Sequence, residues 1–275
     1  MKKQLKFFLW KTGESMIYKK SDYEYNLSLN DIYVVTDFDG TLTVSSSDSS
    51  WASIFKNPNV SEDFVKECVR IFKKYHHLEK DASIPVSQKM EIMNEWYETN
   101  IKTLIDFEIT KEMIDYSAVN KNIMAFRKDA KKFLNLLNKA NVPIIIISAG
   151  VGNIIEKFLE INNCNYPNIF ICSNFLKYEN GIIVGVEHGN LIHSLNKGEV
   201  VLPDSIKNRM YGRRPILLGD NIADIYMLNN PQSAIKIGFL EDDTIEKRKQ
   251  FLEYYDFVCS DDVSYDEIVT QLKLK

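Results

Sequence analysis

The chain has 275 residues, of which 45% are hydrophobic and 26% are charged, a composition typical of a soluble globular protein. Its formal net charge of −4 argues against a nucleic-acid polymer as partner, because such proteins usually carry a basic surface. The apolar run at residues 7–10 is too short for a signal-peptide core or a membrane span, and the four cysteines form no CxxC pair. We therefore expect a cytoplasmic protein that acts without a membrane.

The first buried strand is predicted at Ile32–Thr36, after residues 1–30, which we expect to form an N-terminal arm (1–27) or a short helix. Asp37 and Asp39 follow at once, and side chains two residues apart in extended chain point the same way. Two carboxylates crowded together are costly unless a cation, most simply Mg²⁺, lies between them. A carboxylate held there can attack phosphorus and form an aspartyl-phosphate. The alternative is an Asp-Gly turn with a solvated carboxylate.

Residues 44–117 predict a helical insert. A polar loop at 45–50 comes first, and three segments with apolar residues at helical spacing follow, at about 61–80, from Pro85 to about 104, and at about 109–117. No strand alternates with these helices.

From about residue 123 the chain alternates between strands and helices. The predicted strands lie at 143–147, 169–172, 216–218, 234–237 and 256–259, and Asn180-Gly181 predicts a hairpin. The predicted helices lie at 126–137, 151–162, 198–211, 222–229, 244–254 and 264–274. This alternation predicts an α/β fold, a Rossmann-like doubly wound parallel sheet formed by residues 1–43 and 118–275, with the helical segment inserted after the first strand.

Polar residues end two of these later strands. Ser148 and Gly150 follow one strand, where a hydroxyl and backbone N–H groups can hold a phosphate. Asp220 follows another strand, and Asp224 comes one helical turn later. Lys197 could supply positive charge. Alone, Ser148 could be a helix cap, and Asp224 and Lys197 could be surface residues; together with Asp37 and Asp39 they favour a phosphate site with bound Mg²⁺.

These residues carry a family resemblance. The segments 37–41 (Asp-Phe-Asp-Gly-Thr), Ser148, Lys197 and 219–224 resemble the four motifs of the haloacid dehalogenase (HAD) superfamily of phosphatases. Segments 95–97, 172–175 and 191–197 are similar to the class III cytosolic pyrimidine 5′-nucleotidase family, and the similarity runs from about residue 30 to 270.

The resemblance implies a role for each core residue. Asp37 would be the nucleophile, and Asp39 would protonate the leaving alkoxide and then accept a proton from water. Asp37, the Asp39 backbone carbonyl and Asp220 would hold Mg²⁺, with Asp224 supporting them. Ser148, the backbone of Ala149, and Lys197 would bind phosphate oxygens.

The resemblance also implies that residues 44–117 form a cap that selects the substrate. Glu79 matches the family's base-contacting glutamate, and Asn100 stands where a cap serine contacts the base. Two further departures are Gly40, where the family usually has a larger residue, and a 45–56 loop without the family's Cys-containing segment.

Three functions remain open on the sequence. The first is a phosphatase for pyrimidine nucleoside 5′-monophosphates, for which Trp51, Tyr75, Trp96 and Tyr97 offer stacking surface if they are not simply cap core. The second is a phosphatase for another small phosphomonoester, such as a phosphoamino acid or sugar phosphate. The third, from another class, is an inactive binding protein. Phosphotransfer and oligomeric state have no signal in the sequence.

Overall fold

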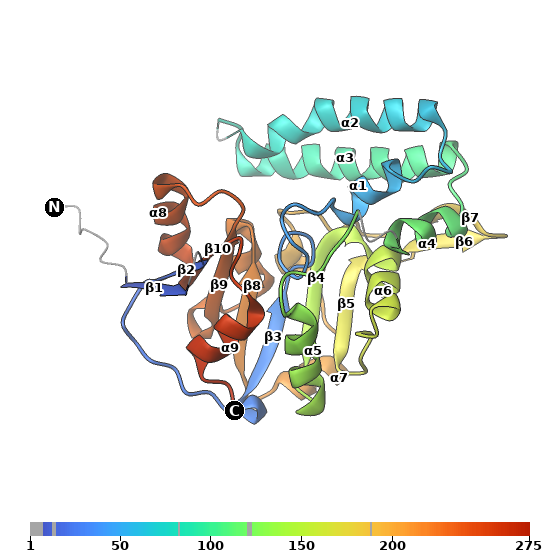
Figure 1. Ribbon diagram of the computed structural model, residues 1–275. Coiled ribbons are helices and arrows are strands. Elements are labelled where there is room, and N and C mark those ends of the chain that lie inside the picture. The colour runs from blue at the N-terminus through green and yellow to red at the C-terminus, as the bar shows by residue number, and fades with distance from the viewer. Residues whose placement is uncertain (1–7, 13–14, 82, 120–122, 188) are drawn as a thin grey trace.

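The structure, a computed structural model, describes residues 8–12, 15–81, 83–119, 123–187 and 189–275. Its main sheet has eight strands in the order β1-β2-β10-β9-β8-β3-β4-β5 (Figure 1). These strands are β1 (Phe8–Thr12), β2 (Ser15–Lys19), β3 (Ile32–Thr36), β4 (Ile144–Val151), β5 (Ile169–Asn174), β8 (Arg214–Gly219), β9 (Ile235–Leu240) and β10 (Phe257–Ser260). A separate hairpin consists of β6 (Leu176–Glu179) and β7 (Ile182–Val186), joined by the predicted Asn180-Gly181 turn.

The helices of the described chain surround this sheet or lie above one edge of it. They are α1 (Ser50–Phe55), α2 (Glu62–Lys80), α3 (Val86–Asp106), α4 (Lys111–Val119), α5 (Ala130–Lys139), α6 (Gly152–Ile161), α7 (Asp204–Met210), α8 (Ile245–Tyr254) and α9 (Tyr265–Leu272). In the described residues no helix is both long and apolar enough to cross a bilayer.

The six strands from β10 to β5 are mutually parallel, as predicted. The N-terminal segment differs from the expected arm or short helix, because β1 and β2 form an antiparallel hairpin and β2 pairs with β10. The strand at Ile32–Thr36 is therefore the third of the chain and not the first. The polar and aromatic residues of this segment show no clear alternation that would predict a strand. They form strands because their backbone pairs with the open edge of the sheet at β10. Residues 1–7 of the expected arm lie outside the described chain.

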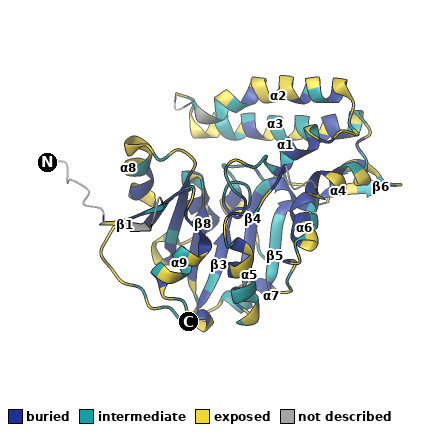
Figure 2. Cartoon of the chain, in the orientation of Figure 1, coloured by how far each residue is buried: buried dark blue, intermediate teal, exposed yellow. Residues whose placement is uncertain are grey.

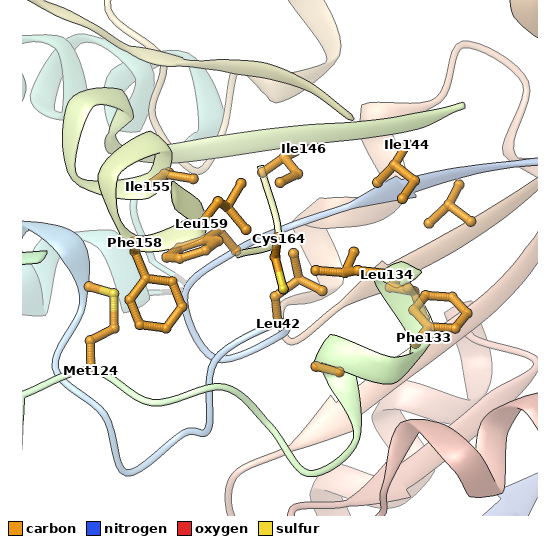
Figure 3. Close-up of a cluster of buried hydrophobic side chains, with 14 of the residues drawn as sticks. Leu42, Met124, Phe133, Leu134, Ile144, Ile146, Ile155, Phe158, Leu159 and Cys164 are labelled. Atoms are coloured by element: carbon orange, nitrogen blue, oxygen red, sulfur yellow. The ribbon is translucent and has the colours of Figure 1, made fainter. Parts of the chain in front are cut away.

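Apolar side chains of the central strands alternate between two hydrophobic clusters. Val34 in β3 and Leu218 in β8 belong to the first cluster, and their neighbours Val35 and Leu217 belong to the second. Helices α5, α6 and α9 cover the first cluster, whereas α7 and α8 cover the second. Figure 3 shows part of the first cluster, where side chains from α5 and α6 gather against β4. Burial on both faces explains the continuous apolar runs of these strands and confirms a doubly wound sheet.

Helices α2 and α3 pack against each other above the sheet (Figure 1). Exposed residues lie mainly on the outer side of α2 (Figure 2), as expected for a helix with one apolar face. The hairpin joins this layer, because Thr110 forms a β-bridge with Ile182 and the Lys111 N–H donates to the Gly181 carbonyl. The expected loop at 45–56 is partly wrong, because Ser49 caps a short helix, α1, through the Ala52 N–H.

Three predicted helices begin late or are not α-helical. The segment 198–211 is helical only from Asp204, directly after Pro203, whose fixed φ suits a helix start. The segment 126–137 becomes helical at Ala130, because Asp129 has a left-handed φ of 61°. The segment Ile222–Met227 is a 3-10 helix.

Candidate active site

The order of the strands brings the predicted site together. Strand β3 lies between β8 and β4, and all three run parallel. Their carboxyl ends place Asp37, Asp220 and Ser148 at one edge of the sheet, where open α/β sheets bind ligands. The convergence expected from the sequence is therefore present in the fold.

Asp37 and Lys197 form a buried ion pair. Lys197 Nζ lies 2.9 Å from Asp37 Oδ2, and the two residues are only 4% and 7% exposed. Oδ1 of Asp37 is buried and accepts no hydrogen bond from the described residues. A buried carboxylate oxygen without a hydrogen-bond partner is unusual, and a bound ion would account for it.

Asp224 is a fully engaged carboxylate and not a surface residue. Its Oδ1 accepts from Lys197 Nζ at 2.7 Å, and its Oδ2 accepts from the backbone N–H groups of Asp220 and Asn221 at 3.2 and 3.0 Å. Asp224 therefore fixes both the lysine and the loop that carries Asp220. The surface alternatives for Asp224 and Lys197 are wrong.

Three carboxylates gather beside the single lysine. One oxygen each of Asp37, Asp220 and Asp224 lies within 4.8 Å of the others. Burial, together with repulsion from Asp37 and Asp224, raises the pKa of Asp220 well above its usual range, and burial raises that of Asp37. Repulsion of this kind is relieved by a cation, and oxygen ligands suit a hard divalent ion. This set of carboxylate oxygens, which includes an Asp37 oxygen without a hydrogen-bond partner among the described residues, therefore fits Mg²⁺.

Asp39 is held by Ser50 at the start of α1. The Ser50 N–H donates to Asp39 Oδ1 at 3.0 Å, and the Ser50 hydroxyl donates to Oδ2 at 2.8 Å. Burial and repulsion from Asp37 raise the pKa of Asp39 to about 7, despite these hydrogen bonds. A carboxyl group with such a pKa can both donate and accept a proton near neutral pH.

The last residues of β4 leave the regular sheet. Pairing between β4 and β5 is irregular between Ile147 and Val151, so Ser148, Ala149 and Gly150 lie in a bulge-like segment. Ser148 is buried, and its Oγ accepts the Gly150 N–H at 3.0 Å. The Ala149 carbonyl accepts from Trp51 Nε1 at 3.0 Å and from Asn174 Nδ2 at 2.9 Å. This segment is therefore rigid beside the carboxylates.

The structure explains why position 40 holds glycine and not the larger residue usual in the family. The φ of Gly40 is 75°, which disfavours a side chain, and a Cβ atom at this position would lie 2.7 Å from Asp220 Oδ2. A larger residue would have to displace the Asp220 carboxylate.

A cavity of about 330 Å³ extends from these groups to α2 and α3. Its floor includes Asp37, Asp39, Ser148 and Lys197. Its upper wall is largely aromatic and is formed by Trp51, Phe55, Phe72, His76, Trp96 and Tyr97. Within that wall the Phe72 and His76 rings stack with centroids 4.4 Å apart. The cavity thus joins a charged end to an aromatic end.

The two predicted cap contacts have different positions. Asn100 lines the cavity, whereas Glu79 does not. Oε1 of Glu79 accepts from the hydroxyl of Ser194, a lining residue, at 2.5 Å, and its Oε2 lies 3.9 Å from His76 Nδ1. Glu79 therefore sits behind the cavity wall, one side chain away from the cavity. Tyr75 is almost completely buried and stacks on Trp96, so its role is in packing.

Two residues beside the site were missed from the sequence. Ser50 lies in a serine-rich stretch with no distinguishing signal. Arg127 is 2% exposed and donates to the backbone carbonyls of Gly40 and Thr41, which holds the turn that follows Asp39. A lone arginine in the first turn of the helix predicted at 126–137 gives no indication of such a contact.

The chain is similar to proteins of one known family. The sequence model of the family described as "Pyrimidine 5'-nucleotidase (UMPH-1)" matches residues 38–274. The human protein named 7-methylguanosine phosphate-specific 5'-nucleotidase is 32% identical over 248 residues, covering 86% of this chain and 82% of the relative. The mouse protein of the same name is 31% identical with the same coverage.

Solved structures agree with these relatives. Cytosolic 5'-nucleotidase IIIB bound to cytidine superposes with a TM-score of 0.79 at 28% identity, covering 89% of this chain and 85% of that one. A phosphoserine phosphatase with a phospho-aspartyl intermediate analogue gives a TM-score of 0.55 at 18% identity, covering 90% and 99%. The second likeness shows a shared fold.

Proposed function

The chain belongs to the pyrimidine 5′-nucleotidase family and has the fold of HAD phosphatases, and from this premise we propose that it hydrolyses nucleoside 5′-monophosphates through an aspartyl-phosphate on Asp37. One observation carries the proposal: the buried Asp37 carboxylate, one oxygen of which has no hydrogen-bond partner in the part of the chain that the structure describes, lies at the charged end of a cavity whose other end is aromatic. The charged end suits a phosphate, and the aromatic end suits a base.

The first step is attack of Asp37 on phosphorus. Lys197 holds Oδ2 of Asp37 at 2.9 Å, and the Asp37 carboxylate forms the bond to phosphorus while the bond from phosphorus to the 5′-oxygen breaks. Asp39 gives its proton to the leaving 5′-oxygen, and the nucleoside departs as a neutral alcohol. In the second step Asp39 takes a proton from water as the water attacks phosphorus, which releases phosphate and restores Asp37.

Other groups hold the phosphate and its charge. Lys197, the Ser148 hydroxyl and the backbone N–H groups near Ala149 lie beside Asp37 and would bind phosphate oxygens. Asp37, Asp220 and the Asp39 backbone carbonyl would hold Mg²⁺, while Asp224 orients Lys197 and Asp220. When bound, Mg²⁺ neutralises charge on the carboxylates and phosphate.

We propose that the chain divides into a cap and a core. Residues 44–117 would form the cap that supplies most of the aromatic wall, and residues 1–43 and 118–275 would form the core that supplies the charged floor. A relative from Caenorhabditis elegans is named putative cytosolic 5'-nucleotidase 3, which supports a cytosolic setting.

For the base we propose a pyrimidine, with CMP ahead of UMP. The cytidine in the structure of cytosolic 5'-nucleotidase IIIB supports this choice. A second candidate is 7-methylguanosine monophosphate, which several relatives carry in their names. The aromatic wall favours this candidate too, because the methylated base is cationic and the face of an indole or phenol ring, as in Trp96 and Tyr97, attracts cations.

One panel of substrates tests the proposal. It contains CMP, UMP, GMP, 7-methylguanosine monophosphate, phosphoserine, a sugar phosphate and p-nitrophenyl phosphate, each with Mg²⁺ and with EDTA. We expect Mg²⁺-dependent hydrolysis with the highest kcat/KM on CMP or 7-methylguanosine monophosphate. A higher kcat/KM on phosphoserine or the sugar phosphate than on every nucleotide would show that the base proposal is wrong.

A further inference from the structure

Ser50 is a buried residue at the edge of the active site, and both its hydroxyl and its N–H group form hydrogen bonds within the protein. It is 0% exposed, and its N–H and hydroxyl donate to the two oxygens of Asp39. The Ser50 Oγ also accepts the Val151 N–H at 3.1 Å. Because that N–H uses a lone pair of Oγ, the hydroxyl's own hydrogen is directed to Asp39.

The backbone around this hydroxyl is shaped to admit it. A Cβ atom on Gly150 would lie 2.1 Å from Ser50 Oγ, so only glycine allows the two segments to approach this closely. Trp51 Nε1 donates to the Ala149 carbonyl, which fastens α1 to the same segment of β4. Three parts of the chain, the turn after β3, α1 and the end of β4, therefore meet at one hydroxyl group.

The two donated hydrogen bonds decide where the Asp39 proton can be. Each occupies a lone pair on one carboxylate oxygen, on the side that faces α1. A proton carried by Asp39 must then lie on the opposite side of the carboxyl group. Asp39 lines the cavity and Ser50 does not, so that opposite side faces the substrate.

We propose that Ser50 is a positioning residue that aims the carboxyl proton of Asp39 at the leaving oxygen, and that it does so only while α1 is docked against the end of β4. The inference rests on the proposed phosphatase mechanism. Ser50 keeps its own hydrogens throughout, and only the Asp39 proton moves to the leaving oxygen. Because α1 begins the segment that leads to α2, proton donation depends on the placement of that segment.

Leaving-group dependence separates this role from a structural one. An alkoxide such as a nucleoside 5′-oxygen needs a proton as it departs, whereas p-nitrophenolate departs readily without one. Ser50→Ala should lower kcat/KM for CMP about 10- to 100-fold, but should lower kcat/KM for p-nitrophenyl phosphate less than about 3-fold. The ratio kcat/KM reports the transfer of the phosphoryl group to Asp37, whereas kcat also includes the later hydrolysis, in which Asp39 acts as a base for both substrates. Ser50→Thr keeps the hydroxyl and should recover most of the activity on CMP.

Ser53 gives a matched control on the same helix. Its hydroxyl is equally buried but donates only to the Ser50 carbonyl, at 2.8 Å. Ser53→Ala should change kcat/KM for CMP and for p-nitrophenyl phosphate by the same small factor. If Ser50→Ala unfolds, Ser50→Cys keeps the volume with a weak donor and should show the same selective loss.

Equal losses of kcat/KM on the two substrates would overturn the positioning role. If the parent enzyme hydrolyses no nucleotide, glycerol phosphate replaces CMP as the substrate with a poor leaving group. The test of Ser50 then proceeds, and only the proposal for the base has failed.

Discussion

Lys197 lies 2.9 Å from Asp37 with both side chains almost completely buried, and it occupies one oxygen of Asp37 while the other has no partner among the described residues. The same ammonium contacts Asp224 at 2.7 Å. The lysine therefore orients the proposed nucleophile without blocking it.

Replacing the nucleophile gives the most direct test. Asp37→Asn should abolish turnover, a loss of several orders of magnitude, because an amide cannot attack phosphorus. The fold should persist, since Lys197 keeps Asp224 as a partner. Steady-state rates on the best substrate, with circular dichroism to check folding, measure this. Activity within tenfold of the parent would rule out Asp37 as the nucleophile.

Removing the buried lysine should affect stability as well as activity. Lys197→Met leaves Asp37 and Asp224 buried without their cation, and breaking a buried pair in this way costs about 3–5 kcal/mol. Denaturant unfolding in EDTA measures the change. Lys247→Met is the control, because the Lys247 side chain is 46% exposed and its pair with Asp242 lies at the surface, so its loss should cost much less stability. Similar losses in both variants would contradict the buried pairing.

Metal dependence should follow the carboxylates. EDTA should remove activity and Mg²⁺ should restore it, because Asp37, Asp220 and Asp224 gather beside one lysine. Asp220→Ala should raise the Mg²⁺ concentration needed for half-maximal activity more than it raises KM for the substrate. Mg²⁺ titrations at fixed CMP measure the first quantity. Full activity in EDTA, or an unchanged Mg²⁺ requirement in Asp220→Ala, would exclude this site.

The charged end of the site was predictable because it depends on strand ends. A buried apolar run has a definite direction, and adjacent parallel strands bring their last residues together, so Asp37, Ser148 and Asp220 could be placed from sequence. The same logic predicted the parallel sheet. These positions follow from local pattern and general topology.

The features that could not be predicted from the sequence depend on contacts between distant segments. Ser50 reaches Asp39 only because α1 docks on the end of β4, and no local pattern distinguishes it from the serines beside it. The β1–β2 hairpin depends on the free edge of β10, which is 238 or more positions away in the chain (257 minus 19). Glu79 matches a motif, yet its hydrogen bond to Ser194 places it behind the wall of the cavity.

We expect Glu79 to influence which substrate the enzyme prefers. The charged end recognises phosphate and not what lies beyond the ester oxygen, so selection must come from the aromatic end and the polar groups near it. The exocyclic amine of cytosine could donate to Glu79 directly, or to Ser194 Oγ while the Ser194 hydroxyl donates to Glu79. In either case Glu79→Ala should lower kcat/KM for CMP about ten- to a hundredfold. p-Nitrophenyl phosphate has no base, and its hydrolysis should change much less.

A second cap glutamate provides the control for this measurement. Glu95 accepts hydrogen bonds from Lys74 and Tyr75 but does not line the cavity, and its side chain is 60% exposed. Glu95→Ala should leave the ratio of kcat/KM between CMP and p-nitrophenyl phosphate unchanged. If Glu79→Ala lowers kcat/KM equally for both substrates, Glu79 serves to fix Ser194 and the end of α2, and the aromatic wall selects the base.

In that case Trp96→Leu should lower kcat/KM for nucleotides and leave kcat/KM for p-nitrophenyl phosphate nearly unchanged. Trp96 lines the aromatic wall and contacts the rings of Tyr75 and Tyr97.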